Sequence, residues 1–124
     1  MLTKIPRNDS AEFFTRERCH IKEVLNHPAS PDLSIARCRV EPGMVTELHA
    51  LEGTSETYFI EAGSGKMDDG TNEAIEVGPG DVVTIPPGHK QRIRNTGSED
   101  LVFTVYCAPR FRPACYVSFP DPIK

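Results

Sequence analysis

Two residues whose side chains can transfer protons or bind metal ions, His49 and Glu56, flank a turn at residues 53–55. Side chains of a strand alternate between its two faces, so Glu56 and Tyr58 share one face of the strand that follows the turn. Glu56 therefore comes back across the sheet toward His49. An imidazole can act as a general base beside a tyrosine, and imidazole and carboxylate groups suit divalent metals. We take His49, Glu56 and Tyr58 as the candidate catalytic residues.

Both residues belong to a pattern of fixed offsets that returns later in the chain. In the first segment, five residues separate Gly43 from His49, four separate Leu51 from Glu56, and six separate Glu56 from Gly63. The second segment has these fixed positions: Gly80, Pro86, Gly88, Gln91 and Asn95. Together they resemble the two conserved motifs of the cupin superfamily, in which three histidines and one glutamate bind a metal. Here Leu51 and Gln91 stand at two of the histidine positions.

The resemblance implies an all-β fold, the double-stranded β-helix (jelly-roll) cupin barrel. It also implies that His49, Glu56 and Gln91 converge inside the barrel as metal ligands. Imidazole and carboxylate suit Fe, Mn, Ni or Zn, whereas a glutamine oxygen is a weak neutral donor. The alternative is a barrel without metal, in which His49 and Glu56 form a buried hydrogen-bonded pair that Gln91 helps to satisfy. His89 is either a replacement ligand or a turn residue at the rim.

Three classes of function remain open, because this fold carries many chemistries. The first is a metal-dependent enzyme of the dioxygenase, isomerase or decarboxylase type that acts on a small anionic metabolite. The second is a non-catalytic module that binds a small molecule. The third is a metal-free epimerase or isomerase, in which His49 is the general base near Tyr58. In the first class, Arg110 and Arg112 are candidates for holding a substrate carboxylate.

Composition limits the class of protein further. A chain of 124 residues suits one domain, and 11 prolines and nine glycines spread between short apolar runs favour a sheet protein with many turns. The formal charge of −4 disfavours nucleic acid and anionic membranes as partners. The sequence shows neither a signal-peptide pattern nor an apolar run of about 18 residues. We therefore expect a cytoplasmic protein with four reduced cysteines.

Within a single cupin domain over 1–124 we expect an N-terminal arm at 1–18, a barrel at 19–108 and a proline-rich tail at 109–124. The arm should dock through Phe13 and Phe14. The prolines of the tail disfavour continuous pairing, so the tail should run extended over the barrel or a partner subunit. Both extensions offer apolar surface for association, and we expect a homodimer.

Strand-like alternation is expected over residues 19–25, 33–40, 45–51, 56–60, 82–85, 91–95 and 101–108. In the last of these runs, Thr104 and Tyr106 should face outward and the apolar residues inward. His20 and His27 should be exposed near a loop, and Arg92 and Arg94 should form a solvated face.

Overall fold

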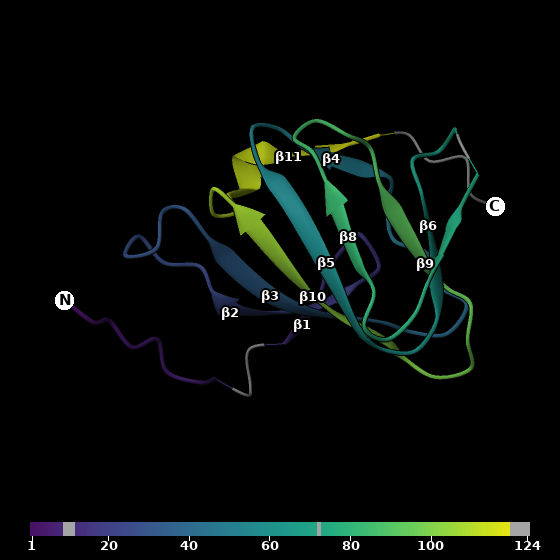
Figure 1. Ribbon diagram of the computed structural model, residues 1–124, viewed down its shortest axis with the longest axis horizontal. Helices are drawn as coiled ribbons and strands as arrows, with labels where there is room; N and C mark the ends of the chain where they lie inside the picture. The colour runs from purple at the N-terminus through teal and green to yellow at the C-terminus, as the bar shows by residue number, and fades with distance from the viewer. Residues whose placement is uncertain (9–11, 72, 120–124) are drawn as a thin grey trace.

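The computed structural model describes residues 1–8, 12–71 and 73–119 and is built almost entirely of strands (Figure 1). The strands are β1 (Phe13–Phe14), β2 (His20–Leu25), β3 (Ser34–Val40), β4 (His49–Leu51), β5 (Ser55–Ala62), β6 (Gly65–Asp68), β7 (Ile75–Val77), β8 (Val82–Ile85), β9 (Arg92–Asn95), β10 (Leu101–Ala108) and β11 (Tyr116–Ser118). One 3₁₀ turn, η1 (Pro113–Cys115), precedes β11. The predicted all-β class is confirmed.

The strands form three antiparallel sheets that enclose one core. The largest sheet has the order β1-β2-β3-β10-β5-β8, and the others are β7-β6-β9 and β11-β4. The buried cluster joins β3, β5 and β10 of the large sheet to β6, β7 and β9, through residues such as Ile60, Phe103, Met67 and Ile93. Two sheets packed over a shared core give the jelly-roll architecture that the motifs predicted.

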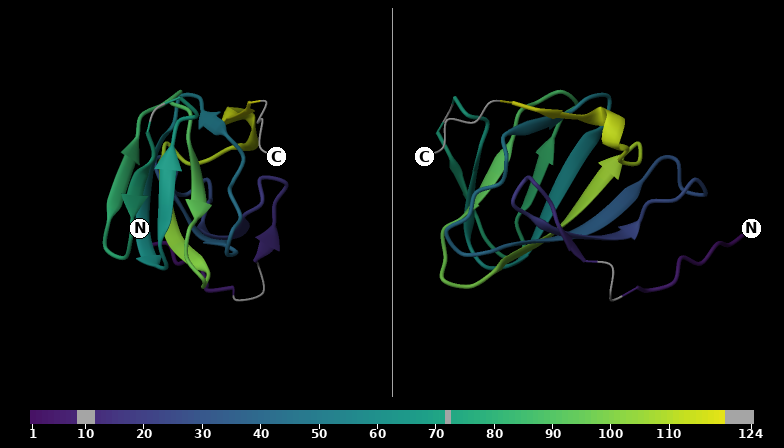
Figure 2. Two further views of the ribbon diagram at one scale, coloured as in Figure 1. Left: turned by 90° about the vertical axis from the view of Figure 1, so that its right-hand side faces the viewer. Right: turned by 180° about the vertical axis from the view of Figure 1, so that it is seen from behind.

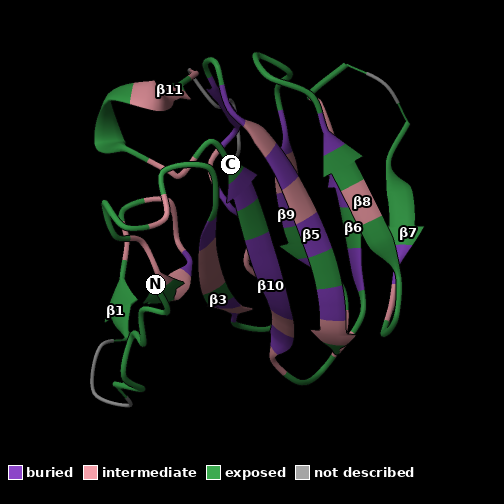
Figure 3. Cartoon of the chain, turned by 60° about the vertical axis from the view of Figure 1, so that its left-hand side comes forward, coloured by how far each residue is buried: buried purple, intermediate pink, exposed green. Residues whose placement is uncertain are grey.

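The alternation predicted for β10 is largely confirmed (Figure 3). The apolar set is buried, namely Leu101, Phe103, Val105 and Cys107, and Tyr106 is exposed. Thr104 is buried, which corrects the prediction that it faces solvent. Its hydroxyl donates a hydrogen bond to the Glu61 carboxylate on the neighbouring strand β5, so the side chains of the two strands cover each other.

The barrel wall begins earlier than residue 19. Phe13 and Phe14 pair with β2, and both rings remain about half exposed. Residues 15–19 then form a tight turn in which Arg18 N–H donates to the Thr15 carbonyl at 3.0 Å and Thr15 N–H to the Cys19 carbonyl at 2.9 Å. Arg18 has a φ of 68°, the left-handed conformation. This segment lies against the barrel, whereas residues 1–8 extend away from it (Figure 2).

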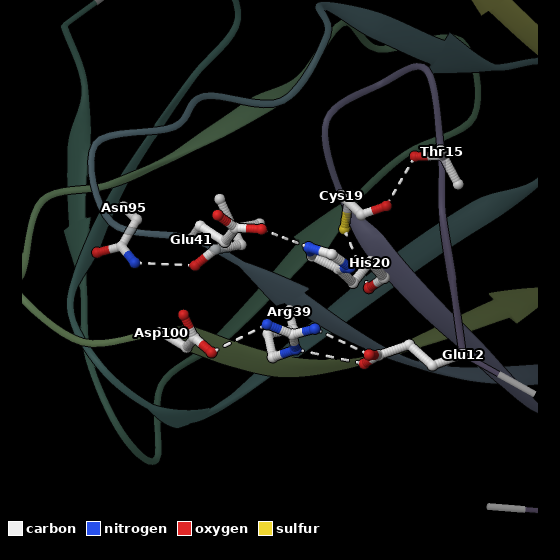
Figure 4. A network of polar contacts seen from close by, with 9 residues as sticks. Glu12, Thr15, Cys19, His20, Arg39, Glu41, Asn95 and Asp100 are labelled. Carbon is white, nitrogen blue, oxygen red and sulfur yellow. Dashed lines mark hydrogen bonds and ion pairs between the residues drawn. The ribbon is translucent and has the colours of Figure 1, made fainter. Parts of the chain in front are cut away.

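A polar network fastens the N-terminal segment to the large sheet (Figure 4). Arg39 on β3 binds the Glu12 carboxylate at 2.8 Å and the Asp100 carboxylate at 3.1 Å. His20 binds Glu41 at 2.7 Å and is half-buried, so the prediction that it is exposed was wrong. The arm is thus held by ion pairs as well as by its aromatic pair.

The end of the chain adds a strand to the barrel. Tyr116, Val117 and Ser118 pair with Leu51, Ala50 and His49 of β4, and Figure 1 shows the two strands side by side. The strand is only three residues long, in agreement with the predicted interruption of pairing. The strand predicted over 45–51 is shorter in the structure, because only residues 49–51 form a continuous ladder and Val45 makes a single bridge to Arg94.

The described residues include no helix that is long and apolar enough to span a membrane.

Candidate functional site

The barrel encloses a cavity of about 190 Å³. His49 on β4 and Glu56 and Tyr58 on β5 line it, together with the N-terminal segment and the end of β11. Gln91 stands beside them, because its backbone exchanges hydrogen bonds of 3.0 and 2.8 Å with that of His49. The structure therefore brings together the four predicted site residues, of which His49, Glu56 and Gln91 are motif positions and Tyr58 shares a strand face with Glu56.

The fold gives different surroundings to the two ring nitrogens of His49. Nδ1 lies 2.8 Å from the backbone carbonyl of Glu47. A carbonyl only accepts hydrogen bonds, so Nδ1 carries the proton and Nε2 of the neutral ring has a free electron pair. Nε2 has no hydrogen-bond partner among the described residues. His49 thus offers the cavity a basic nitrogen in a fixed tautomer.

Tyr116 on β11 fixes the plane of the imidazole, a role that no motif or spacing in the sequence indicated. Its ring stacks on that of His49 with centroids 4.8 Å apart and an angle of 12° between the planes. Its hydroxyl donates a 2.6 Å hydrogen bond to the Glu47 carboxylate. Glu47 therefore connects the two rings, through its carbonyl to His49 and through its side chain to Tyr116.

Glu56 is a buried carboxyl group with few partners. Gln91 Nε2 donates a 2.5 Å hydrogen bond to Oε1, and the Cys107 thiol lies 4.0 Å from Oε2. Burial raises the pKa of Glu56, and His49 and the Gln91 hydrogen bond offset part of that shift. A buried carboxyl group with a raised pKa is suited to acid–base chemistry.

Tyr58 combines a packing role with a polar one. Its ring is buried and stacks on Phe103 with centroids 4.8 Å apart. Its hydroxyl has no hydrogen-bond partner among the described residues, although the side chain lines the cavity. Burial, followed by the charge of Glu56, raises the pKa of the phenol well above its usual value. Tyr58 therefore stays protonated and can donate a hydrogen bond to a ligand.

The residues at the motif positions do not fit a resident divalent cation well. His49 and Glu56 are the strong donors, and Leu51 presents only alkyl carbon at the second histidine position. The Gln91 amide directs its N–H, not its oxygen, at the Glu56 carboxylate. Its oxygen is buried without a partner. Among the described residues no group of three or more His, Cys, Asp or Glu is placed to hold a metal. The predicted ligand set stays a prediction.

His89 lies away from these residues. Its side chain is exposed and 3.7 Å from the Asp69 carboxylate, in keeping with the interpretation as a rim residue. Arg110 likewise does not reach the cavity, because its Nη1 donates to the Asn26 side chain at 2.8 Å. Arg92 is half-buried and binds Asp68 at 2.9 Å, which corrects the prediction that it is solvated.

Glu17 is a site residue that sequence reasoning missed. It comes from the segment predicted to be an extended arm that docks through Phe13 and Phe14, and its side chain is half-buried and lines the cavity. Burial, and then the charge of Glu47, raises the pKa of Glu17 to about 7, while Arg18 opposes the shift. Its carboxylate makes no hydrogen bond or ion pair with any described residue.

The comparisons with known proteins agree with this architecture. Residues 36–107 match the family model described as "Cupin domain", so the chain belongs to the cupin family. The prediction from the motifs is confirmed at this level.

The proteins to which this chain is similar are named after different functions. The chain is 32% identical over 95 residues to the oxalate-binding protein of Thermotoga maritima, covering 77% of this chain and 70% of that protein. It is 34% identical over 84 residues to the glucose-6-phosphate isomerase of Thermococcus kodakarensis, covering 58% of this chain but only 44% of that protein. The structure of Pac13, titled "a unique nucleoside dehydratase", superposes with a TM-score of 0.76 at 19% identity, covering 94% of this chain and 92% of that one.

Proposed function

We propose that this cupin is an enzyme that moves protons on a small molecule, of the isomerase or lyase type, and that it needs no metal ion for that step. One observation carries the proposal. The Glu47 carbonyl holds the proton on Nδ1 of His49 and leaves Nε2 open to an enclosed cavity that Glu56 also lines. A fixed base and a buried carboxylic acid that share one cavity are the parts that such a reaction needs.

In this mechanism each group has one task. His49 Nε2 removes a proton from the bound molecule, and the Glu47 carbonyl, which accepts the Nδ1–H bond, stabilises the imidazolium that forms. Glu56 donates a proton to the group that leaves or rearranges, and Gln91 stabilises the carboxylate that remains. Tyr58 stays protonated and supplies a hydrogen bond to an oxygen of the molecule.

Two of the similar proteins support this class of reaction by their names. Dehydration removes a proton and a hydroxyl group, and the isomerisation of a sugar phosphate moves a proton between carbons. These names support only a class of chemistry, because one likeness is a likeness of fold at 19% identity and the other covers 44% of the relative. The metal-dependent interpretation is ranked second, since the unpartnered Gln91 oxygen is its only specific support.

The test is incorporation of solvent deuterium into candidate molecules, which reports proton removal even where no net conversion occurs. We incubate the protein with mixtures of small hydroxy, keto and amino compounds in heavy water containing a chelator, and detect exchange by mass spectrometry. Exchange should survive chelation, and His49→Gln and Glu56→Gln should each lower its rate by about 100-fold or more. His27→Gln, which changes an exposed histidine outside the site, should leave the rate unchanged.

Two outcomes would overturn the proposal in different ways. If chelation abolishes the exchange and added Fe(II) or Mn(II) restores it, the metal-dependent alternative is established. Compounds that bind, as judged by a rise in melting temperature, but never exchange would identify a binding module without catalysis.

A further inference from the structure

We infer that the cavity selects a small organic cation, an amine with an apolar body, whose ammonium group lies at Glu17. The inference rests on the proposed site but not on its catalysis, since a binding module would show the same preference. It replaces the anionic metabolite expected from the family resemblance.

The charge of the cavity wall is one-sided. Three carboxyl side chains line it, those of Glu17, Glu23 and Glu56, and the described lining residues include no lysine or arginine. An anion that enters such a space loses hydration and gains no ion pair, so its binding is strongly disfavoured. A cation finds carboxyl oxygens, which accept its N–H bonds, at several points of the same wall.

The two arginines that flank Glu17 in the sequence do not change this sign. Arg16 is exposed and is not among the residues that line the cavity. Arg18 Nε donates a 2.7 Å hydrogen bond to the Val45 carbonyl. Its side chain is not part of the cavity wall. Glu17 itself lies close enough to Glu47 for the two carboxylates to repel each other. A cation at Glu17 relieves that repulsion, which an uncharged ligand cannot do.

The rest of the wall suits the body of such a ligand. The lining is mainly apolar, and five aromatic residues contribute to it, namely Phe13, Tyr58, Phe103, Phe111 and Tyr116. Aromatic faces attract ammonium groups through the quadrupole of the ring, most strongly where water is excluded. Aromatic rings together with carboxylates are the combination by which proteins recognise alkylammonium groups. The wall thus complements both the charge and the apolar part of the ligand.

The position of Glu17 is fixed by the backbone. Glu47 N–H donates to the Glu17 carbonyl at 3.1 Å, which holds residue 17 against the strand of the histidine. The ion pairs of Glu12 and the turn at residues 15–19 anchor the segment on either side (Figure 4). The backbone of residue 17 is therefore placed beforehand, so that only the side chain has to be ordered when a ligand enters.

The test uses three probes of matched size and different charge: benzylamine, benzyl alcohol and benzoate. Binding to the full chain is measured by calorimetry at about pH 8 and low salt, where the amine is a cation. Benzylamine should bind at least about tenfold more tightly than benzoate, and Glu17→Gln should weaken the amine about tenfold while the alcohol changes little. Glu76→Gln removes the same charge from an exposed residue outside the cavity wall and should change neither.

The outcomes separate this inference from the proposed function. Equal or tighter binding of benzoate, or no measurable binding of benzylamine to the wild type, overturns the inference even if deuterium exchange is observed. Selective amine binding without exchange in any compound leaves the inference standing and refutes the enzyme. His49→Gln should abolish exchange and keep amine selectivity. The wild-type preference among the three probes requires no variant, so a poorly folded Glu17→Gln protein does not prevent the test.

Discussion

His49 illustrates how one backbone carbonyl decides the chemistry of a side chain. Without the Glu47 carbonyl either nitrogen of the ring could carry the proton, and part of the neutral population would present an N–H to the cavity. The 2.8 Å contact removes that ambiguity, and the stacked ring of Tyr116 removes rotation about the side chain. The base is thus prepared before a ligand arrives.

The raised pKa of Glu17 predicts how the stability of the protein changes with pH. Its pKa is raised from 4.5 to about 7 in the folded protein, so the folded state holds this proton more tightly than the unfolded chain. The stabilisation is fully present below about pH 4.5 and is lost as the pH rises through about 7. Glu17→Gln should therefore stabilise the protein relative to the wild type. The gain in the free energy of unfolding should be larger at pH 8 than at pH 4.5, by up to about 3 kcal/mol.

Urea unfolding of both proteins at several pH values measures this difference. Glu52→Gln, at an exposed turn residue, serves as the control and should shift stability equally at all pH values. A Glu17→Gln effect that does not depend on pH would show that the carboxyl titrates normally.

At the scale of elements, β11 helps to shape the site because it pairs with β4 and carries Tyr116. It is only three residues long, but it pairs with the strand that carries His49 and brings Tyr116 onto the imidazole. Backbone bonds flank it on both sides, from Glu52 N–H to the Cys115 carbonyl at 2.8 Å and from Phe119 N–H to the Leu48 carbonyl at 3.1 Å. In an antiparallel ladder hydrogen-bonded pairs alternate, so Val117 pairs through its N–H with Ala50.

This alternation gives a matched pair of proline substitutions. Val117→Pro removes the ladder bond to Ala50 and should destabilise the protein by about 1–3 kcal/mol and release the aromatic stack. Ser118→Pro places the same ring at a residue whose N–H points away from β4, so it should destabilise the protein much less than Val117→Pro does. Thermal unfolding and the ring proton shifts of His49 report the two effects. Equal destabilisation by both substitutions would mean that β11 is not paired in this register.

At the scale of the whole molecule, the outer face of the large sheet is more apolar than a solvated face requires. Phe59 and Val82 are direct cross-strand neighbours, 38% and 57% exposed, and Tyr106 is 37% exposed on the next strand. They lie on the opposite face from the cavity, because the residues between them on each strand point inward. An apolar face of this kind suits association with a second copy.

We therefore expect a homodimer in solution. Light scattering should give about twice the chain mass of 13.7 kDa. Phe59→Glu should shift the mass toward the monomer, because a buried and unpaired carboxylate is costly at an interface. Ile75→Glu, at a 52% exposed residue on the small sheet, is the control and should leave the dimer intact. A monomer at working concentration in the wild type would contradict the expectation.

Much of the fold was determined by the sequence itself. The motif offsets from Gly43 to Asn95 predicted the barrel, and the period of two along β3 and β10 predicted most of the buried residues correctly. Both signals are local, since alternation along a strand decides which residues can share a face. Alternation also predicted the approach of Glu56 to His49, whereas the approach of Gln91 was implied by the resemblance to the cupin motifs.

Only the tertiary structure decided what surrounds these residues. Tyr116 and Glu17 come from the two ends of the chain, and nothing in a proline-rich tail or a charged arm indicates which strand it will contact. The raised pKa of Glu56 and the carboxyl groups of the cavity wall follow from long-range contacts and burial, whereas the Nδ1 contact of His49 joins residues only two apart in the chain. Alternation assigns a side chain to a face, whereas the charge and hydration it meets there depend on segments distant in sequence.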